Sequence, residues 1–120
     1  MRHTLTIQFD CRDGRRAAAF WAEALGYRAF GSSGPYRSIV PPDGVIGPKL
    51  VFQEVVEPKT SKNRMHLDID LDPGADLEAE VARLRALGAT LASADPIAEE
   101  GMRWYVLRDP EGNEFCVVAA

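Results

Sequence analysis

The chain opens with an alternation of polar and apolar residues that gives way to a helical period. Residues 3–10, HTLTIQFD, alternate at every second position, which is typical of a strand with one buried face. Residues 15–27, RRAAAFWAEALGY, predict a helix instead, because apolar side chains recur there at helical spacing. These side chains are Ala17, Phe20, Trp21, Ala24 and Leu25. Gly26 then ends the predicted helix.

The rest of the first half predicts strands. Residues 35–40, PYRSIV, and 49–56, KLVFQEVV, read as two strands joined through the turn-forming PPDG. A further short strand near YRAF, residues 27–30, would complete the unit. Residues 57–64, EPKTSKNR, have no apolar face and predict a connector.

The second half repeats this order. MHLDIDL, residues 65–71, predicts a strand, Asp76 an N-cap, and LEAEVARLRALGA a helix that Gly88 ends. ATLASA, residues 89–94, is a candidate short strand. GMRWYVLRD and NEFCVVAA predict two clearer strands with DPEGN as the turn between them. The repeat predicts an α+β fold of two modules, about 1–57 and 65–120, within one domain, with helices on one face of a mixed sheet.

The alternation also assigns the faces of the two opening strands. Leu5, Ile7 and Phe9 form the apolar side of the first, and Leu67, Ile69 and Leu71 that of the second. We expect these sides to lie under the helices, because both helices carry apolar stripes that must be covered. The polar side chains then line the opposite sheet face: Thr6, Gln8, Asp10, His66, Asp68 and Asp70.

Composition narrows the classes of partner. The 120 residues are 46% apolar and 27% charged, which suits one globular domain. A formal charge of −4 without a basic block argues against nucleic acid or an anionic membrane as partner. The start of the chain has no signal-peptide pattern, so we expect a cytoplasmic protein. Cys11 and Cys116 are too few for a disulfide framework and predict buried thiols.

Three segments together resemble a known family. FWAEALGY after the first strand, LVFQEVVEPKTSKNRMHLDIDL in the middle and WYVLRDPEGNEFCVV at the end are similar to glyoxalase-like domains of the vicinal oxygen chelate superfamily, which includes bleomycin resistance proteins and dioxygenases. The resemblance covers nearly all of the chain. It implies two βαβββ modules whose strands curve into a cup, helices on the outer face, and a ligand or metal inside the cup. It also implies a homodimer.

The resemblance carries four metal-ligand positions onto this sequence. They fall on Thr6, on Gln53 (or, with a shifted register, Phe52 or Glu54), on His66 and on Cys116. Of these only His66 is a typical ligand, and a divalent first-row metal generally needs three or four suitable donors. We therefore expect no metal or other cofactor. A Zn²⁺ ion held by His66 and Cys116 is the alternative if Asp68 or Glu54 also reaches it.

Each candidate residue keeps a structural alternative. His66 is a candidate catalytic residue or a hydrogen-bonding residue of the cup wall, and Asp68 either orients it or is a solvated acid. Cys116 is a nucleophile only if a cation lowers the pKa of its thiol. Candidate ligand-binding residues are Thr6, Gln8, Gln53, Tyr105 and Cys116. Trp104 and Tyr105 must face opposite sides of one strand, so we expect one of them to enter the cup or its rim.

Three functions follow as hypotheses. The first is a small-molecule-binding protein that uses the cup without the classical metal centre. The second is a metal-dependent lyase, isomerase or dioxygenase that uses His66. The third is a non-catalytic interaction module whose cup is filled by its own side chains.

Overall fold

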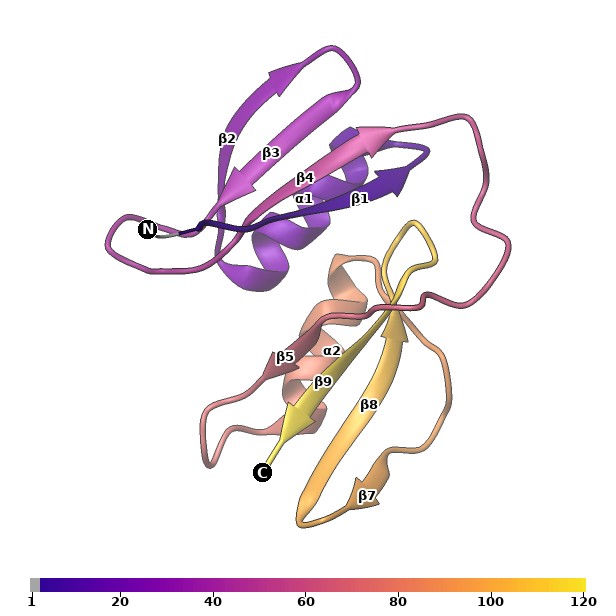
Figure 1. Ribbon diagram of the computed structural model, residues 1–120. Coiled ribbons are helices and arrows are strands. Elements are labelled where there is room, and N and C mark those ends of the chain that lie inside the picture. Colours follow the sequence, from indigo (N-terminus) through magenta and orange to yellow (C-terminus); the bar gives the residue numbers. More distant parts are fainter. Residues whose placement is uncertain (1–2) are drawn as a thin grey trace. The chain divides into compact units, whose positions relative to one another are not determined.

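Helices and strands follow the same order in both halves of the chain (Figure 1). The structure is a computed structural model that describes residues 3–120. It divides into two compact units, Met1–Pro58 and Lys59–Ala120, which we call module one and module two. Each module has its own hydrogen-bonded sheet.

Module one is a βαβββ unit. Its elements are β1 (Thr6–Cys11), α1 (Gly14–Leu25), β2 (Arg28–Ser33), β3 (Tyr36–Val40) and β4 (Lys49–Glu54). The sheet has the order β1-β4-β3-β2, in which β1 and β4 are parallel and the other pairs antiparallel. The strand expected near YRAF is therefore present as β2, at the edge of the sheet.

Helix α1 is capped at both ends and covers one face of this sheet. The Asp13 side chain accepts a hydrogen bond from the Arg16 N–H, and Gly26 closes the helix in the left-handed conformation at φ 70°. Trp21 is 1% exposed and stacks on Phe9, which in turn stacks on Phe52. Trp21 is thus a core residue, as expected, and this aromatic stack joins helix to sheet.

Module two repeats the plan with one addition. Its elements are β5 (Asp68–Asp70), α2 (Leu77–Leu87), β6 (Thr90–Leu91), β7 (Ile97–Glu99), β8 (Met102–Arg108) and β9 (Glu114–Ala119). The sheet order β5-β9-β8-β6 matches that of module one, again with the first and last strands parallel. The sequence pattern did not predict β7, which pairs with β8 outside this path.

The core of module two lies between α2 and its sheet. Leu77, Val81 and Leu84 are the buried residues of α2. They are matched by the fully buried strand residues Leu107, Phe115 and Val117. The predicted N-cap is confirmed, because the Asp76 side chain accepts from the Ala79 N–H, and Gly88 ends the helix at φ 124°. The β8–β9 turn is closed by the buried Asp109, whose carboxylate accepts from two backbone N–H groups.

The α+β class and the two-module plan are confirmed, whereas several boundaries differ from the pattern. Leu5 precedes β1 and is 76% exposed, so it does not belong to the buried face. The strand expected over residues 65–71 is reduced to the three residues of β5, and His66 lies just before it. Both expected buried thiols, Cys11 and Cys116, are indeed buried. Within residues 3–120, no helix is long and apolar enough to cross a bilayer.

Candidate functional site

Three side chains of module two that can bind a metal or move a proton lie together. His66, Asp68 and Cys116 each present one ligand atom, and these atoms lie within 4.8 Å of one another. Strand pairing explains the grouping, because Asp68 is the register partner of Cys116 across the parallel β5–β9 pair. The His66 Nδ1 and Asp68 Oδ1 atoms are 2.9 Å apart. An Asp that accepts from Nδ1–H fixes the tautomer and leaves Nε2 free to accept a proton.

The third member of the group is a protonated thiol at neutral pH. Burial, together with the charge of Asp68 and a hydrogen bond to it, raises the pKa of the Cys116 thiol to about 11, against a smaller opposing effect of Lys62. The nucleophile is the thiolate, so this environment opposes nucleophilic catalysis by Cys116. The thiol instead serves as a small buried side chain that donates to Asp68.

A hollow of about 340 Å³ lies against this group. Its apolar lining comes from alternate positions of β8 and β9, which share one face of the sheet: Met102, Trp104, Val106, Cys116 and Val118. Its polar lining consists of Lys62, His66, Asp68 and Glu114. The hollow has the size of a small-molecule site, and mostly apolar walls with a few polar groups are typical of such sites.

The aromatic residue of this hollow is Trp104 and not Tyr105. In the β8–β9 register Tyr105 lies opposite Val117, which is 0% exposed in the core, whereas Trp104 lies opposite Val118 of the hollow. Arg103 shares the face of Tyr105, and its guanidinium pairs with Glu78 of α2. Tyr105, which we expected to bind the ligand, therefore lies on the opposite face of β8 from the hollow.

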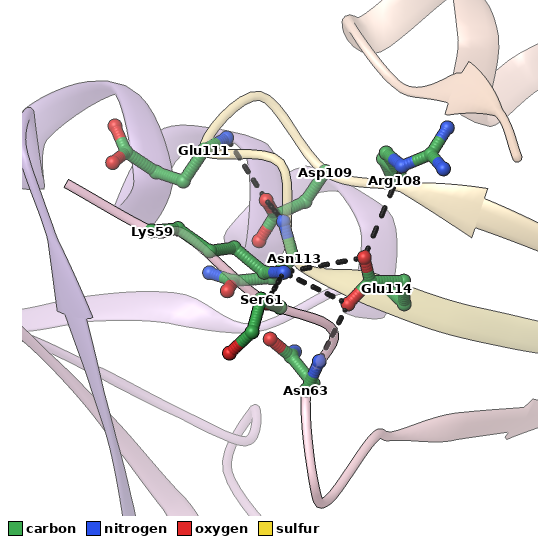
Figure 2. Close-up of polar contacts among 8 residues, drawn as sticks. All are labelled: Lys59, Ser61, Asn63, Arg108, Asp109, Glu111, Asn113 and Glu114. Atoms are coloured by element: carbon green, nitrogen blue, oxygen red, sulfur yellow. Dashed lines mark hydrogen bonds and ion pairs between the residues drawn. The ribbon is translucent and has the colours of Figure 1, made fainter.

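Glu114 fastens the segment before His66 to the sheet (Figure 2). Its carboxylate accepts from the Asn63 N–H at 2.9 Å and pairs with Lys59 Nζ at 3.1 Å. The Lys59 ammonium also donates to the Ser61 carbonyl. Burial opposes ionisation of Glu114, but the bonds from Asn63 and Lys59 outweigh it, and the pKa of the carboxyl lies below its ordinary value. Polar contacts thus order a connector that has no apolar face.

Module one presents a different set on its polar sheet face. Gln8 Nε2 donates to Gln53 Oε1 at 2.6 Å, and Thr6 lies two residues before Gln8 on the same face. The register question is settled in favour of Gln53. Phe52 is 1% exposed in the core, and the Glu54 carboxylate accepts from the Gly14 N–H at the start of α1.

The four positions that the resemblance assigns to a metal do not form a good donor set. Thr6 and Gln53 offer neutral oxygens, and the Gln53 oxygen already accepts from Gln8. Cys116 carries a proton at neutral pH, while metals bind the thiolate. His66 and Cys116 also form a group with Asp68 within module two, whose nitrogen, oxygen and sulfur atoms are of the types that zinc accepts.

Comparison with known proteins identifies the family of the chain. The sequence model of the glyoxalase-like domain matches residues 6–118. The chain belongs to the glyoxalase-like domain family, within the vicinal oxygen chelate superfamily. No functionally curated protein matches it in sequence.

Solved structures of the superfamily share the fold. A glyoxalase/bleomycin resistance protein/dioxygenase family enzyme from Burkholderia phytofirmans is 23% identical, with a TM-score of 0.78 over 95% of each chain. The fosfomycin resistance protein FosX from Mesorhizobium loti is 15% identical, with a TM-score of 0.74 over 100% of this chain and 93% of its own. A FosX mutant from Listeria monocytogenes, solved with Mn(II) and a dihydroxypropylphosphonic acid, is 17% identical, with a TM-score of 0.75 over 98% and 90%. At these identities the likeness concerns the fold alone.

Sequence reasoning missed two residues of module two. Trp104 could have been chosen over Tyr105 by counting back from the DPEGN turn, since that turn fixes which β8 residues share a face with Cys116. Glu114 gave no such signal. Its role depends on contacts with Lys59 and Asn63, more than 50 positions earlier.

Proposed function

We propose that this glyoxalase-like protein binds a small molecule in the hollow of module two, without the classical metal centre of its superfamily. The observation that carries the proposal is the juxtaposition of Trp104 with the His66–Asp68 pair around a space of about 340 Å³. An open hollow of this size favours binding over an interaction module filled by its own side chains.

The lining indicates the class of ligand. The indole of Trp104 and the neighbouring Met102, Val106 and Val118 favour a flat, mainly apolar body, which would be removed from water by stacking and dispersion contacts. His66 supplies a polar contact, because its Nε2 is free when Nδ1 is bonded to Asp68. The ligand is thus expected to combine a flat ring or conjugated system with a hydrogen-bond donor.

Trp104 fluorescence gives a direct test. The chain has two tryptophans, and Trp21 is 1% exposed in the core of module one, so an added compound that enters the hollow changes the emission of Trp104. A panel of flat aromatic phenols and carboxamides should contain saturable quenchers. The emission of a Trp104→Leu variant should stay unchanged by the same compounds.

The polar contact is tested with a matched pair of variants. His66→Ala should weaken binding of the compounds found by about tenfold, on the order of 1.4 kcal/mol for one lost hydrogen bond in a partly exposed site. Gln8→Ala, in module one, should leave binding unchanged. Quenching that persists in Trp104→Leu, or equal affinity of wild type and His66→Ala for every quencher, would refute the proposed site.

A metal-dependent enzyme is the second candidate, because His66, Asp68 and Cys116 offer three ligand types within 4.8 Å. Three protein ligands with a fourth position left for water or substrate are typical of catalytic zinc sites. The test is metal content after purification from medium supplemented with Zn²⁺, Ni²⁺, Mn²⁺ and Fe²⁺. One bound ion per chain that disappears in His66→Ala would replace the leading proposal with this one.

The homodimer and the cytoplasmic location stay predictions. The strand edge β2 and the exposed apolar side chains Val45 and Ile46 are compatible with self-association, since unpaired edges and apolar surface are commonly covered in oligomers. Sedimentation equilibrium over a hundredfold range of protein concentration measures the association directly.

A further inference from the structure

A second recess lies in module one, on the helix side of the sheet and away from the Gln8–Gln53 face. It has a volume of about 440 Å³ and lies between α1 and the β2–β3 hairpin. The helix contributes Ala18, Ala19 and Ala22, whose short side chains leave space beside the strands. Its larger side chains, Phe20 and Trp21, are buried in the core instead. We call this recess the α1–β2 groove.

The groove combines apolar walls with positive charge. Phe30 and Ile39 add apolar surface to that of the alanines, and Arg15 and Arg37 supply two guanidinium groups. Ser32, which shares the face of Arg37, adds a hydroxyl donor, while no Asp or Glu is among the lining residues. The groove is therefore an apolar space with a cationic rim.

The two arginines lack a counter-ion within residues 3–120. Neither forms an ion pair with a described residue, and Arg37 Nε is buried without a hydrogen-bond partner. The side chains of Glu54 and Arg37 both lie beside Gly14, and the Glu54 carboxylate accepts from the Gly14 N–H. A buried donor of a charged group without an acceptor costs free energy, so an anion that supplies the acceptor would bind favourably.

We propose that the α1–β2 groove binds a small organic anion with an apolar body and a carboxylate or phosphate head. The guanidinium fork matches both head groups, because each presents two oxygens to parallel N–H donors. Arg15 lies in the first turn of α1, where the helix dipole adds to the attraction for negative charge. The apolar body fits against the alanines and Phe30. This site is independent of the function proposed for module two.

The test uses three probes that share an unbranched alkyl body: hexanoate, hexyl phosphate and 1-hexanol. Isothermal titration calorimetry and heteronuclear NMR of the full chain report affinity and location. Both anions should bind saturably, and they should shift the Arg37 Nε–H resonance and the methyl resonances of Ala18 and Ala22. Hexanol should bind at least tenfold more weakly, since it lacks the charge that the arginines recognise. The two anions also distinguish a carboxylate ligand from a phosphate ligand.

Variants separate recognition from folding. Arg15→Gln, at an exposed position, should weaken anion binding about tenfold without changing the thermal unfolding midpoint. Arg37→Gln should weaken anion binding by at least as much. Arg37→Lys should recover part of the affinity. The matched control is Arg28→Gln, because Arg28 lies on β2, which lines the groove, but is not itself a lining residue and pairs with Asp43. Ala22→Leu, which fills the space, should abolish binding of both anions.

Three results would overturn the proposal. The first is equal affinity for hexanol and hexanoate, and the second is anion affinity that Arg15→Gln leaves unchanged. The third is a groove occupied by a second copy of the chain, seen as methyl shifts of Ala18 and Ala22 that depend on protein concentration and not on probe. Loss of ligand binding in Trp104→Leu with intact anion binding would separate this site from the function proposed for module two.

Discussion

Module one and module two are built on the same strand order but place different chemistry on equivalent strands. The polar face of the opening strand carries Thr6, Gln8 and Asp10 in module one. The corresponding positions in module two are His66, Asp68 and Asp70. On the parallel partner strands, Val51 of β4 lies opposite Gln8, and Cys116 of β9 lies opposite Asp68. One scaffold thus carries a neutral amide pair in one copy and an ionisable group beside an apolar hollow in the other, which shows that side chains and not topology set the chemistry.

The largest expected effect concerns the aromatic residue that distinguishes the hollow of module two. Trp104→Ala should weaken binding of a flat ligand by about 2 to 3 kcal/mol, a factor of 30 to 150, because stacking and apolar contact are both lost. Calorimetric titration measures this. Tyr105→Leu is the matched control on the opposite face of β8 and should change affinity by less than about threefold. An equal loss in both variants would contradict the assigned faces.

Alkaline pH should destabilise the protein through the Cys116 thiol of module two. Because the folded-state pKa of Cys116 is raised to about 11, its stabilisation is complete below pH 9 and is lost as the pH rises from about 9 to 11. The free energy of unfolding should fall by up to about 2 kcal/mol more in wild type than in Cys116→Ala over this window. Urea unfolding at stepped pH gives the difference. An equal fall in wild type and Cys116→Ala would contradict the raised pKa of Cys116.

Acid should weaken the fastening of the connector in module two. The pKa of Glu114 is lowered in the folded state, so its contribution is complete above the unfolded-state pKa and is lost as the pH falls through the folded-state pKa. Glu114→Gln should lower the free energy of unfolding by about 1 to 2 kcal/mol at pH 7 and flatten the acid limb. Urea unfolding measures this, with Glu78→Gln as control, because Glu78 forms an exposed ion pair with Arg103, and exposed pairs contribute little to stability.

The smallest effect is expected at the amide pair of module one. Gln8→Ala removes an exposed hydrogen bond to Gln53, so the free energy of unfolding should fall by no more than about 0.5 kcal/mol. Thermal unfolding detects this shift. A loss above about 1.5 kcal/mol would mean that the pair is buried by another part of the molecule. The amide pair of module one would then not be the exposed, weakly stabilising contact that distinguishes it from the ionisable group of module two.

The sequence by itself determined both helices, most of the strands and the polar sides of the two opening strands. Periodicity predicted α1 and α2, and single residues predicted the caps Asp76 and Gly26. Alternation predicted the polar face that includes His66 and Asp68. All of these depend on neighbours within one helical turn or one strand. The order of elements also carried the family, which the match over residues 6–118 confirms.

Tertiary structure decided the rest. Whether Trp104 or Tyr105 faces the hollow depends on the register of β8 against β9, and the proximity of Cys116 to Asp68 depends on the parallel pairing of β9 with β5. The raised pKa of Cys116 and the lowered pKa of Glu114 follow from burial and from partners far away in sequence. These two pKa shifts arise from distances between residues that the chain brings together only on folding, so no local pattern encodes them.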